Sequence, residues 1–342
     1  MKAASHIIFL PLEPLEERYT ANWYKYFNNY FSANRIEHLW INGKSCYDKI
    51  QRGAFLDVAG THVWKFHQLQ SVSELMFKDK INDGDTIFLA DIWMPGLEAL
   101  AYMRDGLKKD IKIVGCVFSG TYDEFDFTAK AGMGYWGKDL ENSWFKILDK
   151  IFVATEFHKR LILQHRKCDP KKLIVTGHPI FPEKKVVKFQ DKENIVVFPH
   201  RLDSEKNPRL FETLEEEIRY AGGGQGWKFI RTKDICNTKQ EYYDLLRRAK
   251  IAVSFADQET LGFAMVEAAF AGCFPVVPDT LSYCELYHPI FKYTGFGEAI
   301  HKVFNFMENG DENWYQLELN RNSVELMNHG ANAIPNMMKE IL

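Results

Sequence analysis

Cysteine is scarce in this chain, and its six cysteines are scattered without any C-x-x-C pair. This pattern argues against a disulfide framework and against a structural metal site. Several of the cysteines fall inside expected strands or apolar runs, where a cysteine usually acts as a small buried apolar side chain. His62 and His67 lack metal-ligand spacing with a cysteine or a carboxylate, so we interpret them as packing or surface residues and expect no metal site.

Long apolar runs are missing too. The ten N-terminal residues contain one lysine and an apolar run of only four residues, which is too short for a signal peptide or a membrane span. We therefore expect a cytoplasmic protein.

A strong charge of one sign is the third absence. The chain has 43 Lys and Arg against 46 Asp and Glu, so its formal net charge is −3 and no overall basic field favours nucleic acid or an anionic membrane. A composition of 46% hydrophobic and 26% charged residues is typical of a soluble globular protein. The length of 342 residues suffices for two domains, each with its own core.

Short apolar runs alternate with helical patterns along the whole chain, which is the rhythm of parallel sheets covered by helices. We expect strands at 6–10, 37–42, 86–90, 112–118, 150–154, from 173, and at 195–198, 227–231, 251–255 and 274–277. We expect helices to begin near residues 18, 71, 98, 141, 155, 208, 240, 262, 298 and 314. The glycine-containing segment 132–137 has no strand before it, so we interpret it as a turn rather than a dinucleotide-binding loop.

The segment 251–278 has the most informative pattern. We interpret it as a strand, a polar loop, a helix that starts near Gly262 and is capped by Gly272, and a second strand. Glu259 lies in the loop, and Glu267 lies about one and a half turns into the helix. Both carboxylates can face the crevice at the carboxyl ends of the strands, where open α/β sheets bind ligands.

The start of this helix also predicts an anion site. The backbone N–H groups of Gly262, Phe263 and Ala264 would face the same crevice. Two acceptor-only carboxylates beside a phosphate cradle suit a ligand that is rich in hydroxyl groups and also carries phosphate. A nucleotide sugar has this chemistry.

A second loop lies one βα unit upstream. After the predicted strand 195–198, Arg201 and Lys206 stand five positions apart. Fixed cations of this kind can stabilise a departing nucleoside diphosphate when no metal is bound.

These two segments together resemble the retaining glycosyltransferases of the GT-B fold, especially the large family 4 with its Glu-x(7)-Glu motif. The resemblance covers roughly residues 190 to 290, under a third of the chain. It implies that Arg201 and Lys206 hold the donor diphosphate, that Glu267 binds the ribose hydroxyls and that Glu259 binds the donor sugar. It also places His178 at the cleft, and Glu285 or Tyr283 near the nucleotide.

The resemblance implies two Rossmann-like parallel-sheet domains that face a central cleft. Residues 1–182 would bind the acceptor, residues 193–312 would bind the nucleotide sugar, and the helices of 313–342 would pack back on the first domain. The reaction would move a sugar from a UDP-linked donor with retention and without a metal, and the departing phosphate would help to deprotonate the acceptor. An inverting enzyme would need a protein base, for which Asp91 and Asp123 are the candidates.

The first half of the chain departs from the family pattern in two places. The loop 13–20, which contains Arg18, is acidic and bulky where family 4 enzymes commonly have a glycine-rich turn. Phe118 and Ser119 follow the strand 112–118 where many family members have a histidine beside the sugar. Asp91, Tyr122 or Asp123 would then contact the sugar instead, unless the strands are aligned wrongly.

Asp91 and Trp93 lie just past the carboxyl end of the predicted strand 86–90, where they can meet an acceptor. The alternative role of Asp91 is to cap the helix that follows. The two interpretations stay open at this point.

The segments 17–20 and 91–98 are also similar to segments of phage-type transferases, some of which glycosylate hydroxymethylated bases in DNA. Trp93, Phe118, Tyr122 and Trp136 would stack on an extruded base. The stretch from Lys159 to Lys188, with nine Lys or Arg against two Asp or Glu, would hold the DNA backbone, and the protein would then work in the host cytoplasm. A solvated helix face and linker is the alternative for this stretch.

Other functions compete with this prediction. Aromatic-lined clefts also suit carbohydrate and lipid acceptors. A GT-B sugar epimerase would need no acceptor, and a phosphorylase would need a cofactor lysine site that the sequence does not indicate. A non-catalytic module that keeps a nucleotide-binding cleft belongs to a different class altogether.

Overall fold

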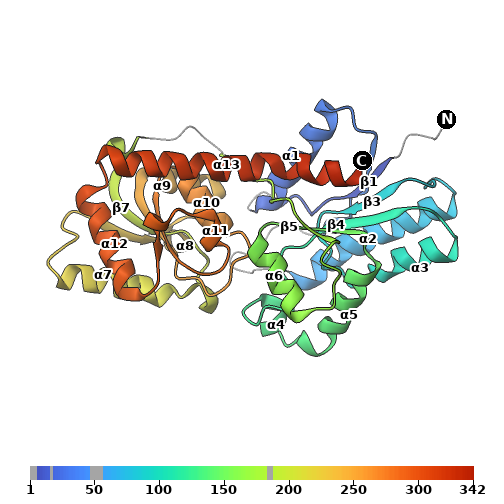
Figure 1. Cartoon of the computed structure of the whole chain (residues 1–342), viewed down its shortest axis with the longest axis horizontal. Helices are drawn as coiled ribbons and strands as arrows, with labels where there is room; N and C mark the ends of the chain where they lie inside the picture. The colour runs from blue at the N-terminus through green and yellow to red at the C-terminus, as the bar shows by residue number, and fades with distance from the viewer. Residues whose placement is uncertain (1–5, 16–17, 47–56, 183–187) are drawn as a thin grey trace. The chain divides into compact units, whose positions relative to one another are not determined.

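The computed structural model describes residues 6–15, 18–46, 57–182 and 188–342 (Figure 1). The chain forms two compact units. Unit 1 contains Met1–Pro179 and Asn332–Leu342, and unit 2 contains Ile180–Ala331. Each unit is built on one parallel sheet, as the alternation of strands and helices predicts.

Unit 1 has a six-stranded sheet in the order β2-β1-β3-β4-β5-β6. All neighbouring strands run parallel, and β1 pairs with β3 from Ile7 opposite Thr86 to Leu10 opposite Leu89. The strands are β1 (Ile7–Leu10), β2 (His38–Trp40), β3 (Thr86–Leu89), β4 (Lys112–Cys116), β5 (Lys150–Val153) and β6 (Leu173–Val175).

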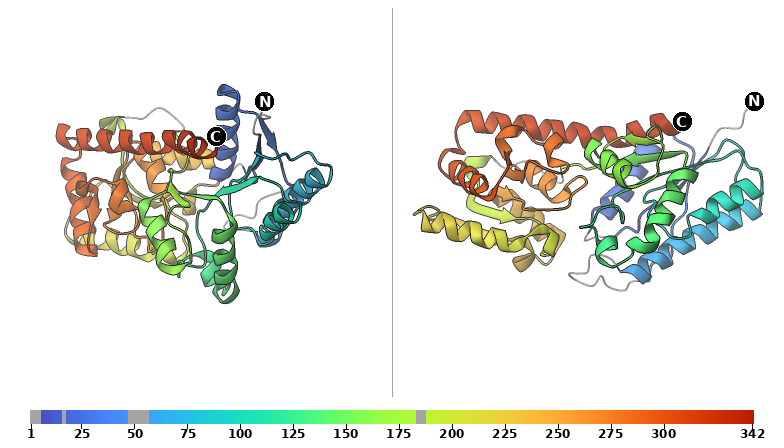
Figure 2. Two further views of the ribbon diagram at one scale, coloured as in Figure 1. Left: turned by 45° about the vertical axis from the view of Figure 1, so that its right-hand side comes forward. Right: turned by 60° about the horizontal axis from the view of Figure 1, so that its bottom comes forward.

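Helices cover both faces of this sheet (Figure 2). They are α1 (Tyr19–Ala33), α2 (Val58–Phe77), α3 (Glu98–Gly106), α4 (Phe127–Lys130), α5 (Gly134–Ile147) and α6 (Glu156–His165). On one face, alternate strand residues such as Ile8 and Ile87 join a core with α2, α3, α5 and α6. On the other face, Phe9 and Phe88 pack against Phe27 of α1, with Phe9 and Phe27 ring centroids 4.8 Å apart.

Two helix predictions in unit 1 were wrong. The second helix begins at Val58 rather than near Ser71, because the side chain of Asp57 caps it by accepting a hydrogen bond from Gly60 N at 2.9 Å. The glycine-containing segment 132–137 is not only a turn, because Gly134 already begins α5. Gly137 instead allows close packing, since a Cβ there would lie 2.7 Å from Thr121 Cγ2.

Unit 2 has a five-stranded parallel sheet in the order β11-β10-β9-β7-β8. The strands are β7 (Glu193–Phe198), β8 (Lys228–Arg231), β9 (Ala249–Val253), β10 (Phe274–Pro278) and β11 (Lys292–Tyr293). The chain proceeds from β7 to β8 on one side and then returns to β9 on the other side of β7. The loops that leave β7 and β9 therefore diverge at a switch point, where open α/β sheets form a crevice.

The helices of unit 2 are α7 (Pro208–Tyr220), α8 (Thr232–Ile235), α9 (Lys239–Arg248), α10 (Phe263–Phe270), α11 (Tyr283–Leu286) and α12 (Phe296–Asn309). Short 3₁₀ turns occur at Phe189–Asp191, Ser204–Lys206 and Pro289–Phe291. The predicted helix at 208–220 is confirmed residue for residue, because Pro208 starts it and Gly222 adopts the positive φ of a helix terminus. Phe274 of β10 stacks on Phe306 of α12 at 4.7 Å in the core.

A single helix, α13 (Asn313–Ile341), ends the chain and contains Pro335. Its first part packs on unit 2, where Asn322 Nδ2 donates to Leu286 O at 2.8 Å. Its last residues, from Asn332 on, belong to unit 1, where Glu340 pairs with Lys150 at 2.5 Å.

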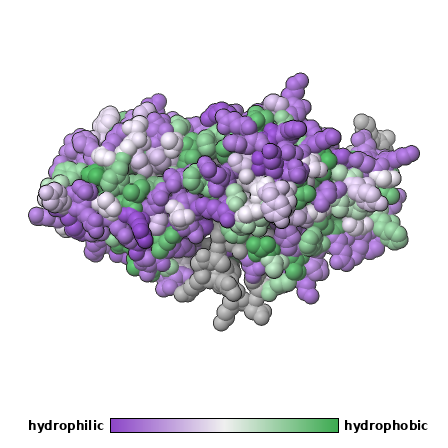
Figure 3. All heavy atoms as spheres, turned by 90° about the horizontal axis from the view of Figure 1, so that it is seen from below, coloured by the Kyte–Doolittle hydropathy of each residue, from purple (hydrophilic) through white to green (hydrophobic). Residues whose placement is uncertain are grey.

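The surface carries no sign of a membrane-spanning element: among the described residues, no helix is long and apolar enough to cross a bilayer. On the face drawn in Figure 3, hydrophilic and apolar residues are interspersed. The largest exposed apolar side chains, such as Phe77, Tyr135 and Tyr220, belong to separate helices, and single residues of this kind are ordinary on a globular surface.

Candidate active site

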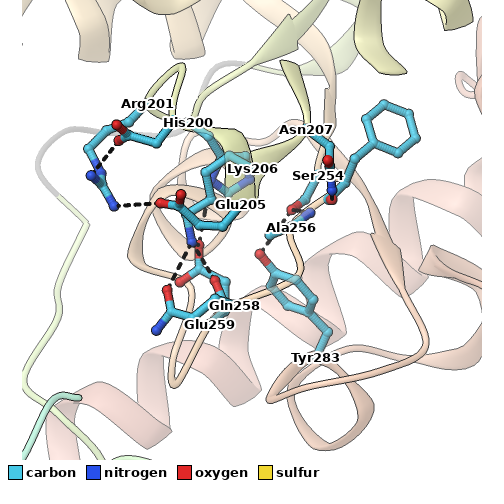
Figure 4. A network of polar contacts seen from close by, with 12 residues as sticks. His200, Arg201, Glu205, Lys206, Asn207, Ser254, Ala256, Gln258, Glu259 and Tyr283 are labelled. Atoms are coloured by element: carbon cyan, nitrogen blue, oxygen red, sulfur yellow. Dashed lines mark hydrogen bonds and ion pairs between the residues drawn. The ribbon is translucent and has the colours of Figure 1, made fainter. Parts of the chain in front are cut away.

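The loops that leave β7 and β9 are tied together by hydrogen bonds at the switch point of unit 2 (Figure 4). Asp257 N donates to Glu205 O at 2.8 Å. Asn207 is in the left-handed region at φ 52°, and its side chain donates to Phe255 O at 2.9 Å and to Asp257 Oδ2 at 2.8 Å. These bonds fix the loop of Arg201 and Lys206 relative to the loop of Glu259, although Glu259 lies 53 positions after Lys206.

Lys206 and Glu259 form an ion pair in this place. Lys206 Nζ lies 2.9 Å from Glu259 Oε1, and the two side chains are 5% and 16% exposed. Lys206 also donates to the carbonyl and, at 3.3 Å, to the side-chain oxygen of Gln258. A buried ammonium group held by three oxygens keeps a defined position, which is what a cation needs to receive a phosphate without reorganisation.

Arg201 is the second cation of this loop. It pairs with Asp203, and its Nη2 lies 3.2 Å from Glu205 Oε1. Its side chain is 34% exposed, so the guanidinium remains accessible from solvent. The structure thus brings Arg201, Lys206 and Glu259 into one neighbourhood, as the spacing of the two motifs predicts.

His200 completes this cluster, and the sequence analysis assigned it no role. It is only 3% exposed, and its Nδ1 lies 3.6 Å from Glu259 Oε1. Burial, and then the positive charges of Lys206 and Arg201, hold the pKa of His200 well below its usual range, so the ring is neutral. A histidine directly before the motif arginine was visible in the sequence, but its burial against the other loop was not.

The helix α10 begins beside these loops. Gly262 is its N-cap with φ 82°, and a Cβ at this position would lie 2.7 Å from Tyr283 Cε1. Glycine is therefore required both for the backbone conformation and for the space. The helix runs from Phe263 to Phe270, so its N-terminal end, where the sequence predicts an anion site, lies directly after this turn.

Tyr283 and Glu285 differ in their surroundings. Tyr283 is fully buried, and its hydroxyl lies 3.1 Å from Ser254 Oγ. Of the two residues expected near the nucleotide, Tyr283 is therefore the buried one, and its ring packs against the Gly262 turn. Glu285 is exposed on α11.

Glu267 has partners that the sequence did not indicate. Its carboxylate accepts hydrogen bonds from Lys239 Nζ at 2.8 Å, Tyr242 OH at 2.9 Å and Tyr243 OH at 2.8 Å, all from α9. A carboxylate has about four lone-pair sites, so these three donors leave little room for further ones. Glu259 and Glu267 thus bind different parts of the protein.

In unit 1, Asp91 forms an ion pair with Lys65 of α2. Asp91 Oδ2 lies 2.6 Å from Lys65 Nζ, and Asp91 Oδ1 accepts from Trp93 N at 3.1 Å. The helix α3 begins only at Glu98, with Leu97 as its N-cap, so the alternative that Asp91 caps this helix was wrong. Asp91 instead closes the turn that follows β3.

The segment after β4 is fixed by Glu141 of α5, which is 1% exposed. Glu141 accepts hydrogen bonds from Trp93 Nε1 at 2.9 Å, from Thr121 N at 2.6 Å and from Arg166 Nε at 2.6 Å. Trp93 also packs against Trp136, with ring centroids 6.1 Å apart. The indole N–H of Trp93 is therefore already bonded within the protein.

The prediction that Tyr122 stacks on an extruded base was wrong. Tyr122 is 4% exposed within the core, and its hydroxyl lies 2.7 Å from His158 Nε2. The neighbouring Asp123 is also buried and accepts a hydrogen bond from Phe125 N at 3.0 Å. Ser119 is half-buried and bonds the side chain of Asp126.

His178, which the resemblance places at the cleft, is fully buried in unit 1. Its ring packs against Phe118 at 4.7 Å and against Trp23 at 5.2 Å. Desolvation raises the pKa of the buried Glu13, and the charge of the half-buried Arg18 opposes this rise in part.

The basic stretch from Lys159 to Lys188 is not one uniform surface. Arg166 is committed to the buried Glu141 network, and Lys172 Nζ donates to Lys146 O and Leu148 O, both at 2.7 Å. Residues 183–187 of the stretch lie outside the described part of the chain. Within the residues that the structure describes, no group of three or more His, Cys, Asp or Glu is placed to hold a metal ion.

No protein-family model matches the sequence. A tRNA-queuosine α-mannosyltransferase from Drosophila melanogaster is 28% identical over 156 residues, which cover 37% of this chain and 41% of the relative. The chain thus spans less than half of that relative's length.

Solved structures match nearly the whole chain at low sequence identity. Sucrose-phosphate synthase from Thermosynechococcus elongatus has a TM-score of 0.66 and 10% identity and covers 98% of this chain and 97% of its own. An α,α-trehalose-phosphate synthase (UDP-forming) from Burkholderia vietnamiensis has a TM-score of 0.65 and 11% identity and covers 99% of each chain. The predicted fold class is confirmed, and the chain has the GT-B fold of these glycosyltransferases.

Proposed function

We propose that this protein is a glycosyltransferase that moves a sugar from a UDP-linked donor to an acceptor hydroxyl group, with unit 2 binding the donor. The observation that carries the proposal is the cluster of Arg201, Lys206 and Glu259 at the switch point of the unit 2 sheet, beside the N-terminus of α10. Cations and helix N–H groups suit a diphosphate, and a carboxylate suits sugar hydroxyls.

In the proposed reaction, Arg201 and Lys206 stabilise the negative charge that develops on the departing diphosphate. Lys206 is held against Glu259 and Gln258, so its position does not depend on the ligand. Glu259 binds hydroxyl groups of the donor sugar. Glu267, whose carboxylate keeps about one lone-pair site beyond its three donors, accepts a hydrogen bond from a ribose hydroxyl group. With two fixed cations on the diphosphate, the proposed reaction uses no metal, and we expect activity to survive chelation of divalent ions.

We further propose that the reaction proceeds with retention. The departing phosphate then assists deprotonation of the acceptor, so no strong protein base is needed. Asp91, the candidate base of an inverting reaction, is ion-paired with Lys65 at 2.6 Å, so its carboxylate is already engaged within the protein.

For the acceptor, we propose a hydroxyl group on a modified nucleoside within a nucleic acid. The Drosophila relative is named for its action on queuosine in tRNA, and the basic side chains of the Lys159 to Lys188 stretch that do face solvent, such as Arg160, Lys167 and Lys171, would contact phosphates. A sugar phosphate is the second candidate, since the two synthases of the same fold are named for such products.

The test measures binding of UDP, UDP-glucose, UDP-N-acetylglucosamine and GDP-mannose by calorimetry, and then product formation with three acceptors. These are duplex DNA with hydroxymethylcytosine, tRNA with queuosine, and glucose 6-phosphate. Product with either nucleic acid, weakened by salt, supports the nucleoside acceptor. If product forms with the sugar phosphate alone, a sugar phosphate becomes the proposed acceptor in place of the nucleoside.

Other outcomes separate the rival functions. Binding without turnover of any donor would favour a non-catalytic module, and interconversion of the bound sugar without an acceptor would favour an epimerase.

The variant Lys206→Met removes one of the two proposed diphosphate-binding cations. Lys228→Met is its matched control, because Lys228 is a 67% exposed lysine of the same unit. No binding of any nucleotide sugar to the wild-type protein would refute the proposal.

A further inference from the structure

His200 has one ring nitrogen that lacks a partner although the residue is 97% buried, since only 3% of it is exposed. Among the residues that the structure describes, none forms a hydrogen bond with His200 Nε2. Buried polar atoms are almost always paired in native proteins, and an exception needs an explanation. In Figure 4, the ring lies within the cluster of Arg201, Lys206 and Glu259, so a ligand bound by this cluster would be its neighbour.

The other ring nitrogen defines which hydrogen-bonding role Nε2 can play. Nδ1 faces Glu259 Oε1 at 3.6 Å. An ionised carboxylate only accepts hydrogen bonds, so it favours the tautomer that carries its proton on Nδ1. The ring is neutral, because burial and the two nearby cations lower the pKa of His200. Nε2 then carries a lone pair and acts as an acceptor.

An acceptor nitrogen discriminates between the two halves of a sugar nucleotide. The oxygens of an ionised diphosphate are acceptors too and cannot donate to Nε2, whereas each sugar hydroxyl group can donate. We infer that His200 Nε2 accepts a hydrogen bond from a hydroxyl group of the donor sugar, and that His200 thereby helps to select the sugar. This inference rests on the proposed function, in which Glu259 binds the same sugar.

The test first identifies the nucleotide sugar that binds wild type best among UDP-glucose, UDP-galactose, UDP-N-acetylglucosamine and GDP-mannose. It then compares the affinities of wild type, His200→Phe and His200→Gln for this nucleotide sugar and for its nucleoside diphosphate. We expect His200→Phe to lower affinity for the sugar nucleotide by about tenfold, the usual effect of one lost hydrogen bond, and to leave affinity for the nucleoside diphosphate within about twofold. His200→Gln places an amide oxygen near the position of Nε2 and should recover part of the loss. Thermal unfolding of each variant controls for folding.

Deoxy analogues of the same donor identify the hydroxyl group. In wild type, replacing one sugar hydroxyl by hydrogen should lower affinity about tenfold, and in His200→Phe the same replacement should cost nothing further. The inference would be overturned if each missing hydroxyl group lowered affinity equally in wild type and in His200→Phe. It would also be overturned if His200→Phe lowered affinity for the nucleoside diphosphate as much as affinity for the sugar nucleotide. Both results would leave the proposed function intact. If no sugar nucleotide binds to wild type, the proposed function fails and the inference fails with it.

Discussion

The ion pair between Lys206 and Glu259 leads to a prediction that separates stability from donor binding. The two side chains are 5% and 16% exposed, so neither charge is well solvated when its partner is removed. Breaking a buried pair by removing one partner costs roughly 3–5 kcal/mol, because the other charge stays buried and uncompensated. Since Glu259 keeps some contact with solvent, we expect Lys206→Met to destabilise unit 2 by about 3 kcal/mol, at the low end of this range.

The double variant tests the reasoning. In Lys206→Met/Glu259→Gln, no uncompensated charge remains, so the second substitution should restore about 1–2 kcal/mol relative to Lys206→Met alone. Because the chain has two units, a single unfolding transition would not report this value cleanly. Hydrogen exchange in peptides from β7 and β9 measures the opening free energy of unit 2 directly.

The same variants have different effects on ligands. Lys206→Met should lower affinity for UDP by about ten- to a hundredfold, because it removes a charge-assisted hydrogen bond to the diphosphate. Glu259→Gln should leave affinity for UDP nearly unchanged and weaken only the sugar nucleotide. The reasoning is refuted if the double variant loses more stability than the two single variants lose together. It is also refuted if Glu259→Gln lowers affinity for UDP as strongly as affinity for the sugar nucleotide.

Three further predictions concern stability. Burial lowers the pKa of His158 to about 3, so below pH 6.5 the unfolded chain binds a proton that the folded chain does not bind. Unit 1 should therefore lose about 2 kcal/mol of stability between pH 6.5 and pH 5. Hydrogen exchange at the two pH values checks this, and a His158→Phe variant should lose less stability. Gly262→Ala should destabilise unit 2 by at least about 1–2 kcal/mol, because φ is 82° and the new Cβ meets Tyr283, and the additional substitution Tyr283→Leu should relieve only the contact with Tyr283. Lys192→Met should cost about 3 kcal/mol of stability, because the three N–H groups of the buried ammonium are surrounded by four backbone carbonyl oxygens near the ends of α9 and α10. An unchanged denaturation midpoint would contradict this.

The cluster of Arg201, Lys206 and Glu259 could be predicted from the sequence because these residues lie in short motifs at the ends of strands. Arg201 and Lys206 share one loop, Glu259 and Gly262 share another, and parallel strands place both loops at one edge of the sheet. Strand pattern, polar loop and glycine position are local signals. The fold class followed from the same local alternation, repeated along the chain.

The partners of these residues could not be predicted, because they depend on tertiary packing. Glu267 is held by Tyr242 and Tyr243, which lie about 25 positions earlier on α9, and nothing in the helical pattern of α9 indicates which face meets α10. The family resemblance implied that His178 lies at the cleft, and Tyr122 was one of three residues expected to contact the sugar in place of the missing histidine. The structure buries both among aromatic side chains, where one hydrogen bond to His158 satisfies the Tyr122 hydroxyl.

This contrast bears on how the two substrates are recognised. A donor that always carries ribose and diphosphate can be bound by the ends of two adjacent strands, and such a site needs few residues at defined spacing. In unit 1, which we propose to bind the acceptor, Asp91 is held by Lys65 and Trp93 is held by Glu141, so helices α2 and α5 position the turn that follows β3. The shape of that turn therefore depends on residues 26 and 48 positions away from the ones it presents. Under the proposed function, specificity for the acceptor depends on how these helices pack. Comparing acceptors across Lys65 and Glu141 variants would test this more directly than substitution of Asp91 or Trp93 alone.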